Sequence, residues 1–337
     1  MKAIGYRTPG PLTADGPLVA FEAETPTLRP RDLLVRVKAV SVNPVDTKVR
    51  AAAAPPEGEA RILGFDAAGV VEAVGPEVTG YSAGDEVFYA GSIDRAGSNA
   101  ELQAVDERIV GRKPATLGFA DAAALPLTSI TAWELLFDRL AVPYGRKTEA
   151  GALLVINGAG GVGSILIQLA RRLTGLTVVA TASRPETIAW CTALGAHHVI
   201  DHRQPLDQGL AAIGIPEVKY VAGLSGTEGH LPAIVRSLKP HGKFALIDDP
   251  KVLDIAPFKM KSLSVHWELM FTRPRFGTPD IAEQRRLLDE VSALVDAGVL
   301  RTTAKQHLGP LSAETLREAH RAIESGRTIG KIVLDGL

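Results

Sequence analysis

The stretch that decides the fold runs from Leu153 to Gly163 and reads LLVINGAGGVG. It begins as a short apolar run of the kind that forms a buried strand. It ends in a Gly-x-Gly-x-x-Gly turn, and a strongly helical stretch follows from Ser164 through Arg172. Strand, glycine turn and helix in this order are the context in which the glycine pattern indicates dinucleotide binding rather than a bare structural turn.

The glycines of this turn have separate physical roles. Gly158 permits the tight turn, Gly160 lets the backbone approach a pyrophosphate, and Gly163 lets the helix pack closely on the strand. The backbone N–H groups at the start of the following helix then face the phosphates. We therefore expect the turn to bind the cofactor through Gly158, Gly160, Gly161, Val162 and Gly163.

Length and composition bound the class of protein. At roughly 150 residues per domain, 337 residues predict two domains. The net charge is −1 and the pI about 6.7, which indicates no basic surface for nucleic acid. No apolar run reaches the roughly 20 residues that a membrane helix needs, the N-terminus has no signal core, and the single cysteine, Cys191, excludes an internal disulfide. We expect a cytoplasmic protein with no nucleic-acid or membrane partner.

Two kinds of pattern divide the chain. Residues 1–126 are β-rich: apolar and polar residues alternate in 32–40 and 69–74, with turn residues between such runs, which predicts a barrel-like or partly open β-domain. The stretch 51–58, AAAAPPEG, is typical of a mobile surface loop.

From residue 127 strands and helices alternate. The expected strands are 152–157, 176–181, 197–200, 218–223, 243–248 and 262–268, and the expected helices are 128–140, 162–174, 185–194, 205–212 and 229–238. Six strands separated by such helices predict a doubly wound parallel sheet of the Rossmann type. The remaining segment has helices expected at 279–297 and 311–325 and a strand at 331–334, and we expect it to pack back on the β-domain. The predicted domains are therefore 1–126 with 274–337, and 127–273.

The end of the second strand of this sheet bears on the cofactor. An acidic residue there usually binds the ribose 2′-OH of NAD. This chain has Ser183 and Arg184 instead, which suit a 2′-phosphate, so the sequence predicts NADPH. The alternative is that Arg184 is a solvated residue at the start of a helix.

Several segments resemble the medium-chain dehydrogenase/reductase superfamily, and within it the quinone oxidoreductase and enone reductase branch. They are Ser41–Asp46, Gly64–Gly69, Ala124–Pro126 with Thr128–Ala132, and Gly160–Gly163. Three more resemble a bacterial subgroup often labelled zinc-type alcohol dehydrogenase-like, namely Ser183–Thr187, Gly195–His202 and Leu263–Phe271. The resemblance implies a GroES-like β-rich catalytic domain before a Rossmann domain, and a homodimer in which sixth strands pair.

The label implies zinc, but the residues do not. Zinc-dependent members carry a Cys near the position of Asn43 and Gly-His-Glu where this chain has Gly64-Phe65-Asp66. A phenyl ring cannot ligate zinc, and the four-cysteine structural site is also missing. His197 and His198 are adjacent on a strand and so face opposite ways. We predict no metal and expect Cys191 to be a core residue.

The resemblance implies that the segment around Asn43 and Lys48 polarises the substrate. Many quinone oxidoreductases have Tyr at the position of Lys48, whereas Lys is similar to plant-type enone and alkenal reductases. An ammonium group there could hold the substrate oxygen as negative charge develops. The alternatives are a surface ion pair of Lys48 with Asp46 or another acid, and a turn-forming role for Asn43.

Family position implies further site residues. Those expected at the cofactor are Thr128, Thr131, Gly223, Leu224, Ser225, Ile247, Asp248 and Lys331. Those expected at an apolar substrate pocket are Phe65, His266, Trp267, Met270 and Phe271. Thr128 could equally be a helix N-cap, Lys331 a surface lysine, and the cluster His266–Phe271 a dimer contact.

These observations predict an NADPH-dependent, zinc-independent oxidoreductase that reduces α,β-unsaturated carbonyls or quinones by hydride transfer. Its substrate would be a small apolar electrophile. The alternatives are a zinc-type alcohol dehydrogenase and an NADPH-binding redox sensor without turnover.

Overall fold

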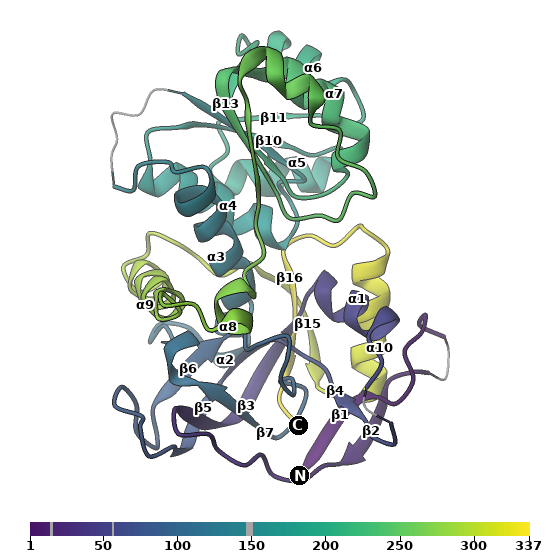
Figure 1. The fold of residues 1–337 in the computed structure, drawn as a ribbon, viewed down its shortest axis with the longest axis vertical. Helices are drawn as coiled ribbons and strands as arrows, with labels where there is room; N and C mark the ends of the chain where they lie inside the picture. The colour runs from purple at the N-terminus through teal and green to yellow at the C-terminus, as the bar shows by residue number, and fades with distance from the viewer. Residues whose placement is uncertain (14–15, 56, 146–150) are drawn as a thin grey trace. The chain divides into compact units, whose positions relative to one another are not determined.

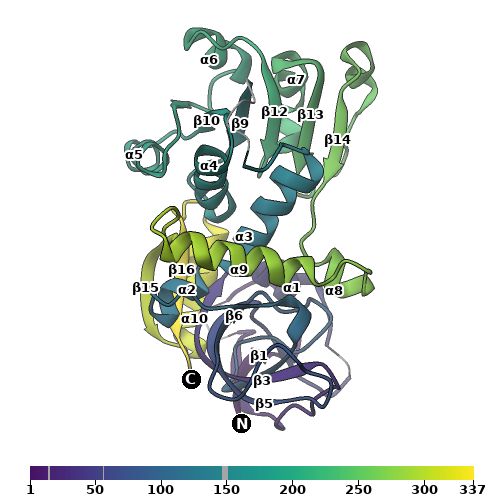
Figure 2. The same ribbon diagram turned by 90° about the vertical axis from the view of Figure 1, so that its left-hand side faces the viewer.

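The chain forms two compact units in a computed structural model that describes residues 1–13, 16–55, 57–145 and 151–337. Unit 1 comprises 1–130 with 271–337, and unit 2 comprises 131–270. Figures 1 and 2 show the ribbon from two directions. None of the described helices is both long enough and apolar enough to cross a membrane.

Unit 1 is built on a mixed sheet of seven strands. Their order is β15-β16-β3-β5-β6-β8, with β7 also paired to β3. The bounds are β3 Asp32–Val42, β5 Asp66–Val74, β6 Glu86–Tyr89, β7 Leu102–Asp106, β8 Val110–Arg112, β15 Ala304–Pro310 and β16 Lys331–Asp335. Because β16 pairs with β3, the expectation that the C-terminal segment returns to the β-domain is confirmed.

A small sheet and several helices complete unit 1. The sheet has the order β2-β1-β4, with β1 Lys2–Tyr6, β2 Val19–Glu22 and β4 Arg61–Ile62. The helices are α1 Pro44–Ala52, η1 Glu107–Ile109, α2 Phe119–Ala123, α8 Thr272–Phe276, α9 Glu283–Asp296 and α10 Ala313–Glu324. Helix α3 Pro126–Trp133 begins in unit 1 and ends in unit 2.

Helix α1 is an element that the sequence reading missed. Asn43 has extended backbone angles, Pro44 occupies the first helical turn, and Asp46 accepts the backbone N–H of Asn43, so the Asn-Pro pair starts a helix. The expected loop also begins later than predicted, because Ala51 and Ala52 are the last helical residues. Alanine is the best helix former, which explains the error. Pro56, inside the predicted loop, lies outside the described residues.

Unit 2 contains the predicted six-stranded parallel sheet. Its order is β11-β10-β9-β12-β13-β14, and each pair of neighbours is parallel. The bounds are β9 Ala152–Ile156, β10 Thr177–Thr181, β11 His198–Ile200, β12 Val218–Gly223, β13 Leu238–Leu246 and β14 Ser264–Trp267. The strand order reverses beside β9, as in a doubly wound sheet, and Figure 2 shows several of these strands side by side.

The helices of unit 2 agree closely with the sequence expectation. They are α4 Gly161–Leu173, α5 Pro185–Leu194, α6 Leu206–Ala212 and α7 Thr227–Ser237, with a short helix η3 Ala256–Lys261. The predicted helix 128–140 is the exception: α3 ends at Trp133, and Glu134–Arg139 forms a π-helix, η2. Apolar side chains of the strands, such as Leu154, Val221 and Phe244, form a core on which these helices pack.

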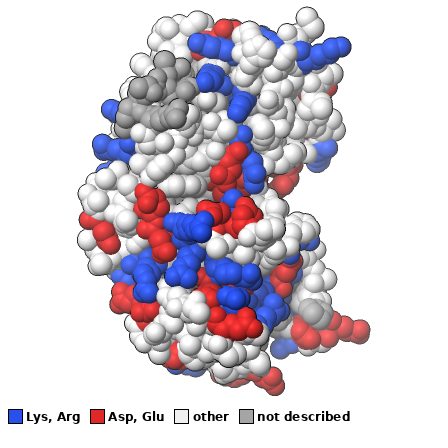
Figure 3. Space-filling view, turned by 60° about the vertical axis from the view of Figure 1, so that its left-hand side comes forward, with Lys and Arg blue, Asp and Glu red and all other residues white. Residues whose placement is uncertain are grey.

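Charged side chains of both signs lie next to one another on the surface. Figure 3 shows one face on which Lys and Arg side chains alternate with Asp and Glu side chains. That face therefore has no uniformly basic area. Elsewhere in the described chain, ion pairs such as Arg112–Asp85 and Arg273–Asp280 join side chains of opposite sign.

Candidate functional site

The glycine turn needs glycine at two positions because the chain is too closely packed for a side chain. A Cβ on Gly158 would lie 2.8 Å from the Cβ of Ala180 and 3.2 Å from Sγ of the buried Cys191. A Cβ on Gly163 would lie 2.6 Å from the carbonyl oxygens of Asn157 and Gly158. The structure therefore supports the packing role that the sequence assigned to Gly163, and it shows that Gly158 also lies too close to β10 and α5 for a side chain.

The start of α4 is suited to an anion. Gly160 is the N-cap of this 13-residue helix and supplies no side chain to cap it. Gly161 and Val162 are partly exposed in the first turn, where backbone N–H groups have no partner within the helix. The turn and helix start therefore fit the pyrophosphate of a dinucleotide.

The residues expected to distinguish NADPH from NADH follow the carboxyl end of β10. Ser183 and Arg184 are both partly exposed, and Arg184 is the N-cap of α5. The Arg184 guanidinium lies 3.3 Å from the Glu186 carboxylate. His202, which the sequence reading did not select, lies beside this strand end, with its Nδ1 3.3 Å from Oγ1 of Thr181. Its position just after β11 was the available signal.

The other predicted cofactor residues of unit 2 also follow strand ends. Gly223 ends β12 and is followed by Leu224 and Ser225, while Ile247 and Asp248 follow β13. The Asp248 carboxylate accepts hydrogen bonds from the N–H and hydroxyl of Thr227, at 2.9 and 2.6 Å. Because the strands are parallel, these residues and the glycine turn share one edge of the sheet.

A buried polar cluster lies in unit 1. Nζ of Lys331 is 3.0 Å from Oδ2 of Asp66 and 2.9 Å from the carbonyl oxygen of Val42, and it also donates to Oδ1 of Asn43. The other carboxylate oxygen of Asp66 accepts the backbone N–H of Leu127 at 2.7 Å. Lys331 is therefore not the surface lysine of our alternative reading. Its ammonium has three acceptors inside unit 1, which also argues against the phosphate contact expected for it.

Asn43 and Asp46 belong to the same cluster. The side-chain amide of Asn43 donates to Asp66 at 2.7 Å and accepts from Lys331, so both of its ends are used within unit 1. In this structure the Asn43 side chain therefore helps to hold the buried cluster together. Burial raises the pKa of the Asp46 carboxyl to about 7; the backbone N–H of Asn43 and the charge of Lys331 oppose the rise, and Asp66 adds to it.

Lys48 lies on the exposed face of α1, whereas Val49 and Arg50 are buried. Arg50 holds the helix to α10: one guanidinium nitrogen lies 3.1 Å from Nδ1 of His320 and another pairs with Glu324. The Tyr6 hydroxyl donates to the carbonyl oxygen of Val49 at 3.0 Å. The helix that carries Lys48 is thus anchored from its buried side.

The two threonines of α3 are both buried. The Thr128 hydroxyl donates to the carbonyl oxygen of Leu125 at 3.2 Å, and α3 begins two residues earlier, at Pro126. The alternative reading of Thr128 as an N-cap is therefore wrong. Thr131 opens the part of the helix that belongs to unit 2.

The five predicted substrate-pocket residues fall into two groups. Phe65 and Phe271 are buried in unit 1 with ring centroids 5.0 Å apart. His266, Trp267 and Met270 belong to unit 2, and only Met270 of these is fully buried. Trp267 is 52% exposed on β14, the edge strand of the sheet.

The fold defines an α/β protein with a GroES-like sheet and a Rossmann-like parallel sheet. Residues 29–130 match the family model of the alcohol dehydrogenase GroES-like domain, and 194–334 match that of the zinc-binding dehydrogenases. The chain is 40% identical to a zinc-type alcohol dehydrogenase-like protein of Staphylococcus aureus, covering 99% of this chain and all of the relative. The chain therefore belongs to the medium-chain dehydrogenase/reductase superfamily, and it is an oxidoreductase of that superfamily.

Two further relatives bear on structure and chemistry. A crystal structure from Rhizobium etli CFN 42, named as a zinc-dependent alcohol dehydrogenase, has 55% sequence identity and a TM-score of 0.96, covering 100% of this chain and 98% of its own. A chloroplastic NADPH-dependent alkenal/one oxidoreductase of Arabidopsis thaliana is 39% identical over 189 residues, which are 52% of this chain and 46% of the relative.

Zinc, which these names imply, does not fit the residues present. Among the described residues there is no group of three or more His, Cys, Asp or Glu side chains that could hold a metal ion. Asn43 and Phe65 offer an amide and a phenyl ring, and the Asp66 carboxylate is neutralised by Lys331. A catalytic zinc needs three nitrogen, sulfur or carboxylate ligands and an open position.

Proposed function

We propose that the protein is an NADPH-dependent, zinc-independent reductase of α,β-unsaturated carbonyls or quinones. One observation carries the proposal. Lys331 supplies a buried positive charge to Asp66 and Asn43, at the positions where zinc-dependent members carry ligands, and Lys48 stands exposed on the adjacent helix. With these residues at the ligand positions, the protein would polarise its substrate with side chains rather than with a metal.

The cofactor would be held by unit 2. The glycine turn and the start of α4 would bind its pyrophosphate, and Ser183 and Arg184 its 2′-phosphate. When bound, NADPH supplies the hydride that adds to the β-carbon of an enone. The Arabidopsis relative, whose name specifies NADPH, supports this choice of cofactor.

Lys48 would act on the substrate. Hydride addition leaves negative charge on the carbonyl oxygen, and a preorganised cation near that oxygen lowers the barrier. The Lys48 ammonium can hold the oxygen while the enolate forms. Arg50 and Asp46, on the buried side of α1, would keep the helix in place. A lysine at this position favours direct reduction of the carbon–carbon double bond over quinone reduction.

The remaining parts of the proposal concern the substrate and the assembly. The paired rings of Phe65 and Phe271 suit a small apolar electrophile as substrate. The exposed edge strand β14, with Trp267 on it, favours a homodimer of the kind that the resemblance implies.

Two other functions compete. A zinc-type alcohol dehydrogenase agrees with the names of the relatives, but its metal lacks ligands here. A redox sensor would bind NADPH tightly and reduce none of the electrophiles offered to it.

The proposal is tested by steady-state oxidation of NADPH with an enone, comparing the wild type with Lys48→Ala and Lys38→Ala. Lys38 is an exposed lysine on β3 of the same unit and serves as the control. Loss of the charge at residue 48 should lower kcat by about 100-fold, the effect of removing one group that stabilises an oxyanion. NADPH affinity should not change. Equal kcat values for all three proteins would remove Lys48 from the mechanism.

A further inference from the structure

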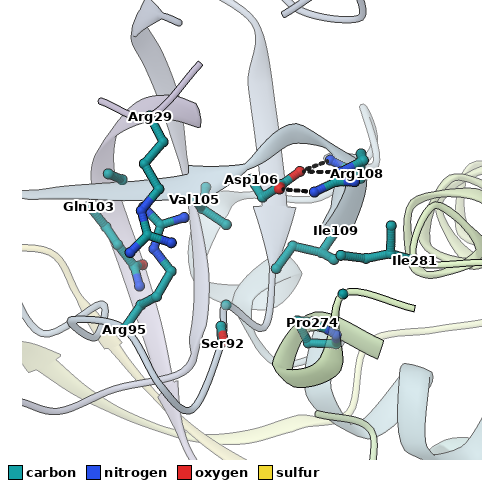
Figure 4. Close-up of a pocket in the computed structure, with 13 residues that line it drawn as sticks. Arg29, Ser92, Arg95, Gln103, Val105, Asp106, Arg108, Ile109, Pro274 and Ile281 are labelled. Atoms are coloured by element: carbon teal, nitrogen blue, oxygen red, sulfur yellow. Dashed lines mark hydrogen bonds and ion pairs between the residues drawn. The ribbon is translucent and has the colours of Figure 1, made fainter. Parts of the chain in front are cut away.

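Unit 1 contains a hollow of about 160 Å³ that the proposed reaction does not use (Figure 4). Side chains of Arg29, Arg95 and Arg108 line its polar part. An adjoining hollow of about 140 Å³ shares four lining residues with it, Arg29, Arg95, Gln103 and Ala104. Arg29 and Arg95 therefore border both spaces.

Two of the three arginines are fixed by carboxylates. Arg95 contacts both oxygens of the buried Asp32, at 2.8 and 2.6 Å. Arg108 contacts both oxygens of Asp106, through Nε at 3.0 Å and Nη2 at 2.7 Å. Such two-point pairs hold each guanidinium in one orientation and balance its charge. A guanidinium has five N–H groups, so each arginine keeps further donors for another acceptor.

Arg29 is the arginine without such a balance. Its backbone N–H donates to Asp32, but its guanidinium makes no ion pair within the part of the chain that the structure describes. Figure 4 shows the side chains of Arg29 and Arg95 pointing toward one another. Because Arg95 is already paired with Asp32, Arg29 carries the unbalanced positive charge of the hollow, and this charge attracts an anion.

The rest of the lining limits what kind of anion fits. Val105, Ile109, Pro274 and Ile281 contribute apolar side chains to the lining, and Figure 4 shows the last three on the side away from Arg29 and Arg95. Gln103 lines both hollows and is 3% exposed; its Nε2 donates to the carbonyl oxygen of Ala96, while Oε1 has no partner among the described residues. The lining thus combines cationic donors and apolar side chains with the polar groups of Ser92 and Gln103 and with the Asp106 carboxylate, which is paired with Arg108.

We propose that this hollow binds a small organic carboxylate. The carboxylate would lie between the guanidinium groups of Arg29 and Arg95, and the hydrocarbon part against Ile109 and Ile281. The hollow of about 160 Å³ has the volume of roughly five water molecules, at about 30 Å³ each in the liquid. This volume suits an acid of about four carbons. Inorganic phosphate would satisfy the arginines but not the apolar side chains, and a neutral amide would satisfy the apolar side chains but not the arginines.

The test is an NMR titration of the full-length, isotope-labelled protein with butyrate, butyramide and phosphate at constant low ionic strength. The variants are Arg29→Gln and, as the control, Arg301→Gln, an exposed arginine of the same unit that does not line the hollow. We expect saturable butyrate shifts at the Gln103 side-chain amide, and about tenfold weaker binding in the Arg29 variant, since one charge-assisted hydrogen bond is lost. The Arg301 variant should bind like the wild type.

Four outcomes would overturn the proposal. They are no saturable binding of butyrate, equal binding of butyramide, equal or tighter binding of phosphate, and an Arg29 variant that binds butyrate like the wild type. None of these measurements depends on the reductase activity, so the two proposals stand or fall separately.

Discussion

At the scale of single residues, Asp46 links the buried cluster to stability. Its folded-state pKa of about 7 lies above the ordinary value near 4, so the folded protein holds the proton more tightly than the unfolded chain. The stabilising contribution of this group is therefore complete below about pH 4 and is lost as the pH rises to about 7.

We predict that the wild type loses stability relative to Asp46→Asn between pH 5 and pH 7. The difference should change by up to about 1.4 kcal/mol per pH unit, because the asparagine cannot titrate. Urea unfolding of both proteins at several pH values measures this difference, and the contributions of other titrating groups cancel in it. A difference that is constant over this range would mean that Asp46 is ionised throughout.

Lys331 is the second residue whose role is measurable without a substrate. Lys331→Met should destabilise the fold by about 3–5 kcal/mol, because it leaves the fully buried Asp66 without its charged partner. Lys305→Met removes an exposed lysine of the same unit and should change stability by no more than about 0.5 kcal/mol. Denaturant unfolding compares the two. If both variants unfolded at the same denaturant concentration, the ion pair would contribute nothing.

At the scale of elements, the strand–turn–helix unit β9–α4 gives the sharpest contrast between two glycines. A Cβ at residue 163 meets backbone oxygens at 2.6 Å, whereas a Cβ at Gly229 in α7 meets no atom within 4 Å. Gly163→Ala should cost about 1–3 kcal/mol of stability by overpacking and weaken NADPH binding. Gly229→Ala should gain up to about 1 kcal/mol through helix propensity and leave NADPH binding unchanged.

Thermal unfolding and fluorescence titration with NADPH measure both effects. Normal NADPH affinity in the Gly163 variant would show that the close approach of α4 to β9 is not needed for the cofactor.

The elements also show what the sequence could and could not predict. In unit 2 most strands are apolar runs, and helix ends are marked by residues such as Pro185 at the start of α5 and Gly195 at its end, so most expected bounds agree with those observed. The exceptions are β13, which begins at Leu238 rather than at residue 243, and the helix expected at 128–140, which ends as an α-helix at Trp133. Helix α1 was missed because Asn-Pro favours both a turn and a helix start, and only the contact of Asp46 with Asn43 decides between them.

The buried cluster of Asn43, Asp66 and Lys331 could not be predicted from the sequence. Residues 43, 66 and 331 are brought together by the pairing of β16 and β5 with β3, and nothing in the local pattern of Gly330-Lys331 distinguishes a buried lysine from a surface one. Only the pairing of strands that are distant in the sequence shows that Lys331 is buried beside Asp66. The glycine turn, by contrast, was recognisable because its whole function lies within one short segment.

At the scale of the whole molecule, the proposed function needs a nucleotide-binding unit and a unit that would polarise the substrate without a metal. Sequence reading predicted both units and the return of the C-terminal strand. The names of the relatives instead favour zinc, so the decisive issue is whether turnover needs a metal.

The most direct measurement is the oxidation of NADPH and NADH, followed at 340 nm, by chelator-treated full-length protein with enones, quinones and simple aldehydes. We predict turnover of enones or quinones with NADPH, at a rate that chelator does not change and that is much higher than the rate with NADH. Activity confined to aldehydes, lost on chelation and restored by zinc, would contradict this prediction.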